Sequence, residues 1–109
     1  MTSKIVIPRE LARSDVEAAV DYLLLEAGGE VALGFVDALE ETYDLIARYP
    51  KSGSLRYGYE LGLPELRGIS LKRYPYIVFC REQKDSVDVW RILHGKRDIP
   101  LSMQESENR

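Results

Sequence analysis

The sequence predicts an α+β fold in which a short first strand is followed by a two-helix antiparallel hairpin and a three-stranded antiparallel meander. Two long segments with apolar residues at three- and four-residue spacings predict the helices, and three short apolar segments that follow them predict the strands. Helices and strands that are segregated along a chain favour one sheet packed on the helices. A length of 109 residues allows one such domain with a single core.

The N-terminal strand is expected at Ile5–Ile7, and the first helix follows it. This helix begins either at Pro8, which is tolerated in a first turn, or at Ser14, which has the capping-box spacing to Glu17. Gly28–Gly29 is expected to end it, because glycine readily closes a helix in the left-handed conformation. Its apolar positions are Leu11, Ala12, Val16, Ala19, Val20, Leu23 and Ala27.

The second helix is expected to run from Val31 to Ala47 and to end at Tyr49–Pro50, since the residue before a proline is pushed out of helical space. Joined by a glycine turn, the two helices form an antiparallel hairpin. Gly34 lies inside the second helix, where glycine costs about 1 kcal/mol relative to alanine. Close packing against the first helix would explain it. The periodic residues are Val31, Ala32, Phe35, Val36, Leu39, Tyr43, Ile46 and Ala47.

A loop, three strands and a tail are predicted for the remaining residues. Residues 51–65 are dense in glycine and fit neither periodicity, which is typical of a connecting loop. The single domain is expected to span residues 1–100, with a polar, frayed tail over 101–109. The strands are expected at Leu66–Lys72, Tyr76–Glu82 and Val87–Leu93, with a bend at Tyr74–Pro75 and a hairpin turn at Gln83–Ser86.

The strand Val87–Leu93 is apolar on both faces and runs into a charged turn. Alternation places Val87, Val89 and Leu93 on one face and Trp90 and Ile92 on the other. A strand that is buried on both sides belongs in the middle of a sheet. The charged turn at its end then lies where a partner can be met.

Charge is divided unequally along the chain. Residues 9–49 hold 10 acidic and 3 basic side chains, whereas residues 50–98 hold 10 basic and 6 acidic ones. The opposite charges reflect either solvated acidic helices beside a basic sheet or a surface that steers a partner. The composition is that of a soluble protein without a membrane span or secretion signal, so a cytoplasmic location is expected. A single Cys80 and a single His94 favour neither a disulfide nor a metal site, and no cofactor is expected.

Two strings in the predicted sheet region are informative, Arg73–Arg81 (RYPYIVFCR) and Arg91–Ile99 (RILHGKRDI). Together with the order of the predicted elements, they resemble the ParE branch of the RelE/ParE toxin superfamily. The resemblance extends over nearly the whole chain. The resemblance implies the toxin of a type II toxin–antitoxin operon, of the kind that stabilises plasmids. It also implies a ParD-like antitoxin whose disordered C-terminal segment folds on the toxin. For the ParE branch the implied target is DNA gyrase, which is poisoned on DNA and not chemically altered, so that nucleic acid is contacted only indirectly.

The RelE branch provides the alternative, a ribosome-dependent mRNA endoribonuclease. RNA scission of that kind needs a base, cations for the phosphate and an acid. RelE-like chains place a histidine before and a tyrosine after the basic pair that follows the last strand, where this sequence has Gly95 and Pro100. His94 lies one residue earlier, which turns its side chain to the other face of a strand. A catalytic set of His94, Arg73, Arg81 and Arg97 is therefore the less favoured hypothesis, as is a partner module that has lost toxicity.

Partner contacts are expected on cations of the sheet and on tyrosines of the glycine-rich loop. A pI near 5.2 disfavours a ribosome-binding nuclease, whose affinity depends on phosphate neutralisation. The arginines, Arg91 included, could instead pair with the acidic helices. If the hairpin covers only one face of the sheet, the other face is open. An acidic and apolar segment of the antitoxin is then expected to bind that face and the groove of the hairpin. The expected contacts are Arg67, Arg73, Arg81, Lys96, Arg97, Tyr57 and Tyr59.

Overall fold

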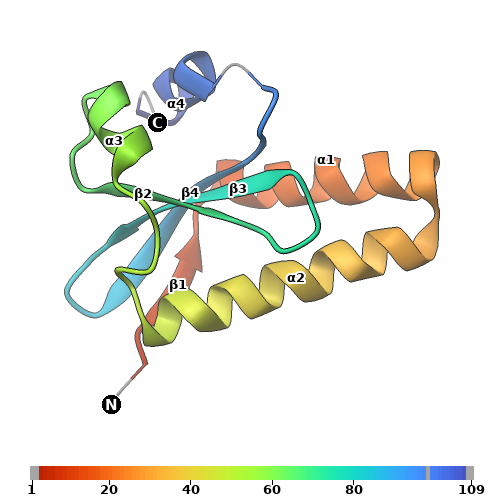
Figure 1. Ribbon diagram of the computed structural model, residues 1–109, viewed down its shortest axis with the longest axis horizontal. Helices are drawn as coiled ribbons and strands as arrows, with labels where there is room; N and C mark the ends of the chain where they lie inside the picture. The colour runs from red at the N-terminus through yellow and green to blue at the C-terminus, as the bar shows by residue number, and fades with distance from the viewer. Residues whose placement is uncertain (1–2, 98, 108–109) are drawn as a thin grey trace.

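The computed structural model describes residues 3–97 and 99–107, the last three of these by their backbone only. Asp98 and the end of the predicted tail lie outside the described residues. A helical hairpin packs on a twisted sheet, and two short helices lie near the other side of that sheet (Figure 1). The elements are β1 (Ile5–Pro8), α1 (Glu10–Ala27), α2 (Gly29–Arg48), α3 (Arg56–Leu61), β2 (Leu66–Ser70), β3 (Tyr76–Glu82), β4 (Ser86–His94) and α4 (Ile99–Glu107).

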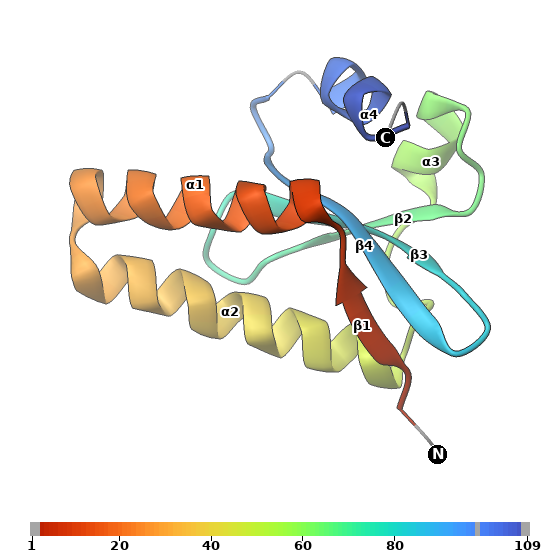
Figure 2. The ribbon, with the colours of Figure 1, turned by 180° about the vertical axis from the view of Figure 1, so that it is seen from behind.

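The sheet has the strand order β1-β4-β3-β2, with β1 parallel to β4 and the other pairs antiparallel. The predicted order of strand, hairpin and meander is therefore confirmed. Figure 2 shows β1 beside β4, although Ile5 and its partner Ser86 are 81 residues apart in the sequence. The strand β4 is interior, as its two apolar faces indicate.

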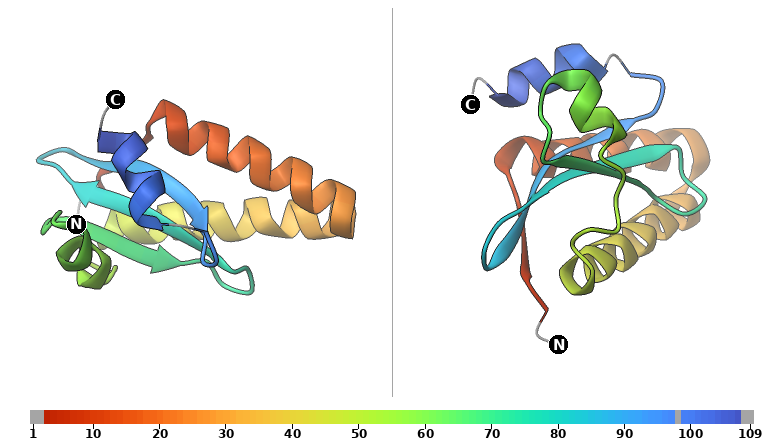
Figure 3. Two further views of the ribbon diagram at one scale, coloured as in Figure 1. Left: turned by 90° about the horizontal axis from the view of Figure 1, so that it is seen from above. Right: turned by 60° about the vertical axis from the view of Figure 1, so that its left-hand side comes forward.

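Two apolar clusters lie on opposite faces of this sheet. The larger cluster joins the hairpin to the sheet, around Phe35 and Val78, which have no exposed surface. The second cluster gathers Phe79, Trp90 and Met103 under α3 and α4. Figure 3 shows these two short helices on the side of the sheet away from the hairpin. The expectation of an open second face is thus wrong for the part that α3 and α4 cover.

Both short helices differ from the sequence prediction. Residues 51–65, expected to be a loop, contain α3, and residues from 101 onward, expected to fray, continue α4. Isolated helices this short are marginal in water, so packing rather than propensity holds them. A Cβ at Gly58 would meet the backbone oxygens of Leu63 and Leu66, which shows how closely α3 lies against the following chain. In α4, Met103 is 1% exposed and belongs to the second cluster.

A β-bulge in β4 makes the predicted faces of Ile92 and Leu93 wrong. Phe79 pairs with Arg91 but Cys80 pairs with Val89, so Trp90 is an extra residue on β4. An inserted residue reverses the alternation of side chains beyond it. Ile92 therefore joins the hairpin cluster with Val89, and the next residue, Leu93, joins Trp90 in the second cluster.

The hairpin differs in detail from its prediction. Helix α1 begins at Glu10, and Pro8 ends β1, so neither Pro8 nor Ser14 starts the helix. Gly28, with φ of 94°, closes α1 and leads directly into α2. The close packing at Gly34 is not with α1: a Cβ there would meet the hydroxyl of Tyr74, which donates to the Val31 carbonyl at 2.9 Å. The missing side chain lets α2 accept this tyrosine from the β2–β3 connection.

A buried ion pair joins the hairpin to β4. Arg91 donates from Nε and Nη2 to the two carboxylate oxygens of Asp15, each at 2.8 Å. Asp15 also accepts the amide of Ile92 at 2.9 Å, and Arg91 donates from Nη1 to the carbonyl of Ser102 at 2.8 Å. The side chains of Arg91 and Asp15 are 3% and 7% exposed. Arg91 therefore forms the ion pair with an acidic helix that the sequence suggested for the arginines. The same side chain links α1, β4 and α4.

Replacing Asp15 by asparagine is expected to destabilise the protein by about 3–5 kcal/mol, because it leaves a buried guanidinium without its counter-charge. Urea unfolding followed by circular dichroism measures the change. The control is Glu65→Gln, which removes the exposed partner of Arg81 and should cost less than about 1 kcal/mol. Equal losses for the two variants would show that burial does not set the strength of the Asp15–Arg91 pair.

Candidate functional site

Three of the predicted cations gather at one end of the sheet, where β3 begins and β4 ends. Tyr76 pairs with His94 there, and an amide hydrogen bond of 2.8 Å from Gly95 to the carbonyl of Pro75 joins the two flanking turns. The exposed cations of these turns, which we name the cationic end, are Arg73, Lys96 and Arg97. Among the side chains described, those of residues 3–97 and 99–104, none of the three forms an ion pair. The cationic end therefore presents positive charge that the described carboxylates do not neutralise.

The backbone of Arg73 is unusual. Its φ of 69° is the only positive value found at a non-glycine residue in the described chain. A left-handed conformation costs an L-residue about 1–2 kcal/mol, and glycine or asparagine takes it more readily. The backbone thus does not account for an arginine at this turn.

His94 stands beside the cationic end, but its ring is engaged. Its Nδ1 accepts the amide of Lys96 at 3.1 Å, and its ring packs edge-on against Tyr76 with centroids 5.2 Å apart. A neutral imidazole that accepts at Nδ1 carries its proton on Nε2, so neither nitrogen is left as a free base. His94 shares a shallow cavity of roughly 140 Å³ with Tyr22, Tyr76 and Arg97. Burial, and secondarily Tyr22, raises the pKa of Tyr76, which keeps that phenol protonated.

The other predicted cations lie elsewhere. Arg81 is five residues along β3 from Tyr76, about 17 Å at the usual rise of a strand, and it binds Glu65 at 2.7 Å. Arg67 donates to the carbonyl of Gly53 at 2.8 Å and so holds the segment after α2. The structure therefore does not bring Arg81 to the end of the sheet that carries His94, Arg73 and Arg97.

The two predicted tyrosines have different surroundings. Tyr57 packs edge-on against Phe79 with ring centroids 5.3 Å apart, and it lies over Gly68, so it belongs to the second cluster. Tyr59 is 71% exposed on α3. Of the two, Tyr59 is the one whose ring is accessible to a partner.

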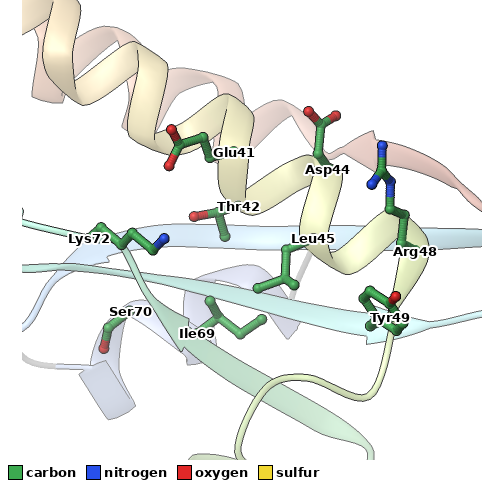
Figure 4. A pocket seen from close by; sticks show the side chains of 9 residues that line it. All are labelled: Glu41, Thr42, Asp44, Leu45, Arg48, Tyr49, Ile69, Ser70 and Lys72. Atoms are coloured by element: carbon green, nitrogen blue, oxygen red, sulfur yellow. The ribbon is translucent and has the colours of Figure 1, made fainter.

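A groove of roughly 400 Å³ between α2 and the edge strand β2 is a second candidate surface. Figure 4 shows Leu45 and Ile69 facing one another across it, with charged side chains along the rim. Leu45 and Tyr49 are 42% and 56% exposed, which is unusual for apolar groups that sit side by side. The lining residues are Glu41, Thr42, Asp44, Leu45, Arg48, Tyr49, Ile69, Ser70 and Lys72.

Sequence reasoning missed this groove. Leu45 lies on α2 and Tyr49 follows the last residue of that helix, and both lie outside the periodic stripe that faces the core, which is the only local signal. Its second wall comes from β2, and that pairing depends on the tertiary fold. Beyond the bridge between Ser54 and Gly68, β2 is an edge strand, so a partner could extend the sheet beside Ser70.

The described residues form no metal site, and the thiol of Cys80 is buried. The side chains of residues 3–97 and 99–104 include no group of three or more histidine, cysteine, aspartate or glutamate residues that could bind a metal. Within residues 3–97 and 99–107, none of the helices is both long and apolar enough to cross a membrane. Cys80 is 1% exposed, and burial raises the pKa of its thiol to about 11, against a smaller lowering by Arg67.

The thiol of Cys80 is expected to resist alkylation in the folded protein at pH 8. With a pKa of about 11, only about one thiol in a thousand is ionised at that pH, and the thiolate is the reactive form. Since the pKa in the folded protein lies above the ordinary thiol value of 9.0, this group stabilises the fold below pH 9 and loses that contribution as the pH rises toward 11. Iodoacetamide labelling followed by mass spectrometry tests the protection, with the urea-unfolded chain as control. Rapid labelling of the folded protein would contradict it.

Comparison with known families identifies the family of this chain. Residues 6–99 match the model of the ParE toxin of the type II toxin–antitoxin system parDE. This chain belongs to the ParE toxin family. It is a toxin of type II toxin–antitoxin systems, and that membership implies an antitoxin partner.

A solved structure confirms the fold of this ParE toxin. A chain from the chromosomal ParDE toxin–antitoxin system of P. aeruginosa superposes with a TM-score of 0.70 at 22% sequence identity, covering 84% of this chain and 96% of that one. At 22% sequence identity, this match shows the fold alone. A search of curated proteins gives no match.

Proposed function

We propose that this ParE toxin inhibits DNA gyrase by binding it through the cationic end, without cleaving nucleic acid itself. The observation that carries the proposal is a set of three exposed cations beside an imidazole whose Nδ1 already accepts a backbone amide. Unneutralised cations steer and bind acidic surfaces, whereas proton transfer needs a base within reach of the reacting proton. Gyrase as the target is what the likeness to the ParE branch implies.

One observation favours the ribonuclease alternative. His94, Tyr76 and Arg97 line one cavity, so an imidazole, a phenol and a guanidinium are close together. Against it, Arg81 is at the other end of the sheet and the Nδ1 of His94 is occupied. The two functions predict opposite results for a change of His94.

The combined variant Arg73→Gln, Lys96→Gln and Arg97→Gln is expected to weaken inhibition of gyrase supercoiling at least about tenfold, because it removes three charges that face the target. The matched variant His94→Gln is expected to stay within about twofold of the unchanged toxin. Supercoiling of relaxed plasmid by purified gyrase measures both. Cleavage of ribosome-bound mRNA that His94→Gln abolishes would instead establish the nuclease.

We infer that the cognate antitoxin places its C-terminal segment in the groove between α2 and β2. The groove supports this because it offers exposed Leu45 and Tyr49, the basic side chains of Arg48 and Lys72, and a free strand edge at Ser70. An acidic and apolar segment matches those groups. The outer face of the sheet, the other surface expected from the sequence, is partly covered by α3 and α4.

Leu45→Glu is expected to weaken antitoxin binding at least about tenfold, since it places a charge where an apolar side chain should be buried. The control is Leu25→Glu at the tip of the hairpin, where the side chain is 87% exposed and lies outside the groove. Isothermal calorimetry with the purified antitoxin measures both affinities. If the control variant loses affinity and Leu45→Glu does not, the antitoxin binds the hairpin tip.

A further inference from the structure

A separate pocket lies on the outer face of the sheet, between the segment before β2 and the strands β3 and β4. Its volume is roughly 330 Å³. Small pockets with apolar walls and a few converging polar groups are the usual form of a site that binds one side chain or a small molecule. The pocket is lined by Leu63, Pro64, Glu65, Leu66, Arg81 and Trp90.

Trp90 brings an unused hydrogen-bond donor to this pocket. Its side chain lies in the wall, the residue is 6% exposed, and Nε1 has no acceptor among the described residues. An indole nitrogen can only donate, and a buried donor without an acceptor is unfavourable. The chemistry therefore points to an incoming oxygen atom.

Two cations lie near this indole, one over the ring and one in the lining of the pocket. The guanidinium carbon of Arg9 is 4.2 Å from the centre of the ring, and Arg81 lines the pocket itself. Arg81 donates from Nε at 3.1 Å and from Nη2 at 2.7 Å to one oxygen of Glu65. A carboxylate of the chain itself thus shows which group the guanidinium of Arg81 binds.

The contact with Glu65 is exchangeable. Its side chain is 70% exposed and that of Arg81 is 42% exposed, and ion pairs so open to solvent contribute little to stability. Arg81 and Glu65 line the same pocket as Trp90, whose Nε1 is buried and has no acceptor among the described residues. A competing carboxylate would separate Arg81 from Glu65 by taking the place of Glu65.

We propose that the pocket beside Trp90 binds an acidic side chain flanked by aliphatic residues, presented by a partner polypeptide. The carboxylate binds Arg81 and accepts from Trp90, while the aliphatic neighbours pack on Leu63 and Leu66. Glu65 and the nearby Asp88, which is 3.5 Å from Arg9, disfavour a run of phosphates. The proposal depends neither on gyrase nor on the antitoxin groove.

The test uses Trp90 as its own reporter, because the chain contains a single tryptophan. The probe is an acetylated and amidated leucine–glutamate–leucine tripeptide, titrated into the ¹⁵N-labelled protein while the one indole N–H resonance is followed. We expect a saturable downfield shift. The matched peptide with glutamine in place of glutamate should bind at least about tenfold more weakly, since it cannot form the charged contact.

Three variants make the test specific. Arg81→Gln should weaken the tripeptide at least about tenfold, and Glu65→Gln should tighten it at least about twofold because it frees Arg81. Arg56→Gln is the control, since Arg56 forms a similar exposed pair with Glu60 outside the pocket and should leave the titration unchanged.

Several outcomes would overturn the proposal. They are the absence of a saturable shift up to about 10 mM tripeptide, equal binding of the glutamine peptide, or no effect of Arg81→Gln. Inorganic phosphate is titrated in parallel, and a shift with phosphate alone would assign the pocket to a phosphate-bearing ligand instead. Because gyrase inhibition is not measured, failure here leaves the proposed function untouched.

Discussion

The pair of Asp15 and Arg91 is the interaction on which the rest of the structure depends. Taking two charges out of water is unfavourable unless their geometry is good and their remaining donors and acceptors are satisfied. Here the carboxylate accepts three hydrogen bonds, two from the guanidinium and one from the amide of Ile92. The third nitrogen of the guanidinium reaches the carbonyl of Ser102 on α4. One buried charge thus fixes the hairpin, the central strand and the last helix relative to one another.

The β-bulge at Trp90 gives β4 a different role on each side of that pair. Before the bulge, Val87 and Val89 face the hairpin, and after it Ile92 does. The extra residue turns Trp90 outward, against Arg9 and the pocket that Arg81 lines. Bulges commonly redirect side chains next to functional surfaces. In this toxin, a single inserted residue places the only tryptophan of the chain on the outer face.

Local patterns were sufficient to predict most of the fold. The apolar periodicities of α1 and α2, the glycine turn at Gly28 and the two apolar faces of β4 each depend on neighbouring residues, and each is found in the structure. The misses involve pairings across the chain. The bulge depends on register with β3, α3 and α4 depend on packing against the second cluster, and Gly34 makes room for Tyr74 from another element. For the site, the sequence predicted Arg67, Arg73, Arg81, Lys96 and Arg97 as one set of contacts, and the structure gathers Arg73, Lys96 and Arg97 at one end of the sheet and leaves Arg67 and Arg81 elsewhere. The groove that Lys72 lines could not be predicted, because its walls come from α2 and β2.

The distance along the sequence between Asp15 and Arg91 has a consequence for folding during translation. Asp15 and Arg91 are 76 residues apart, so the first helix waits for its buried counter-charge until nearly the whole chain has been synthesised. Contacts between such distant segments form late, after the entropy of closing a long loop has been overcome. The hairpin alone leaves its apolar face uncovered during translation. The core between the hairpin and the sheet therefore forms only when nearly the whole chain has been synthesised.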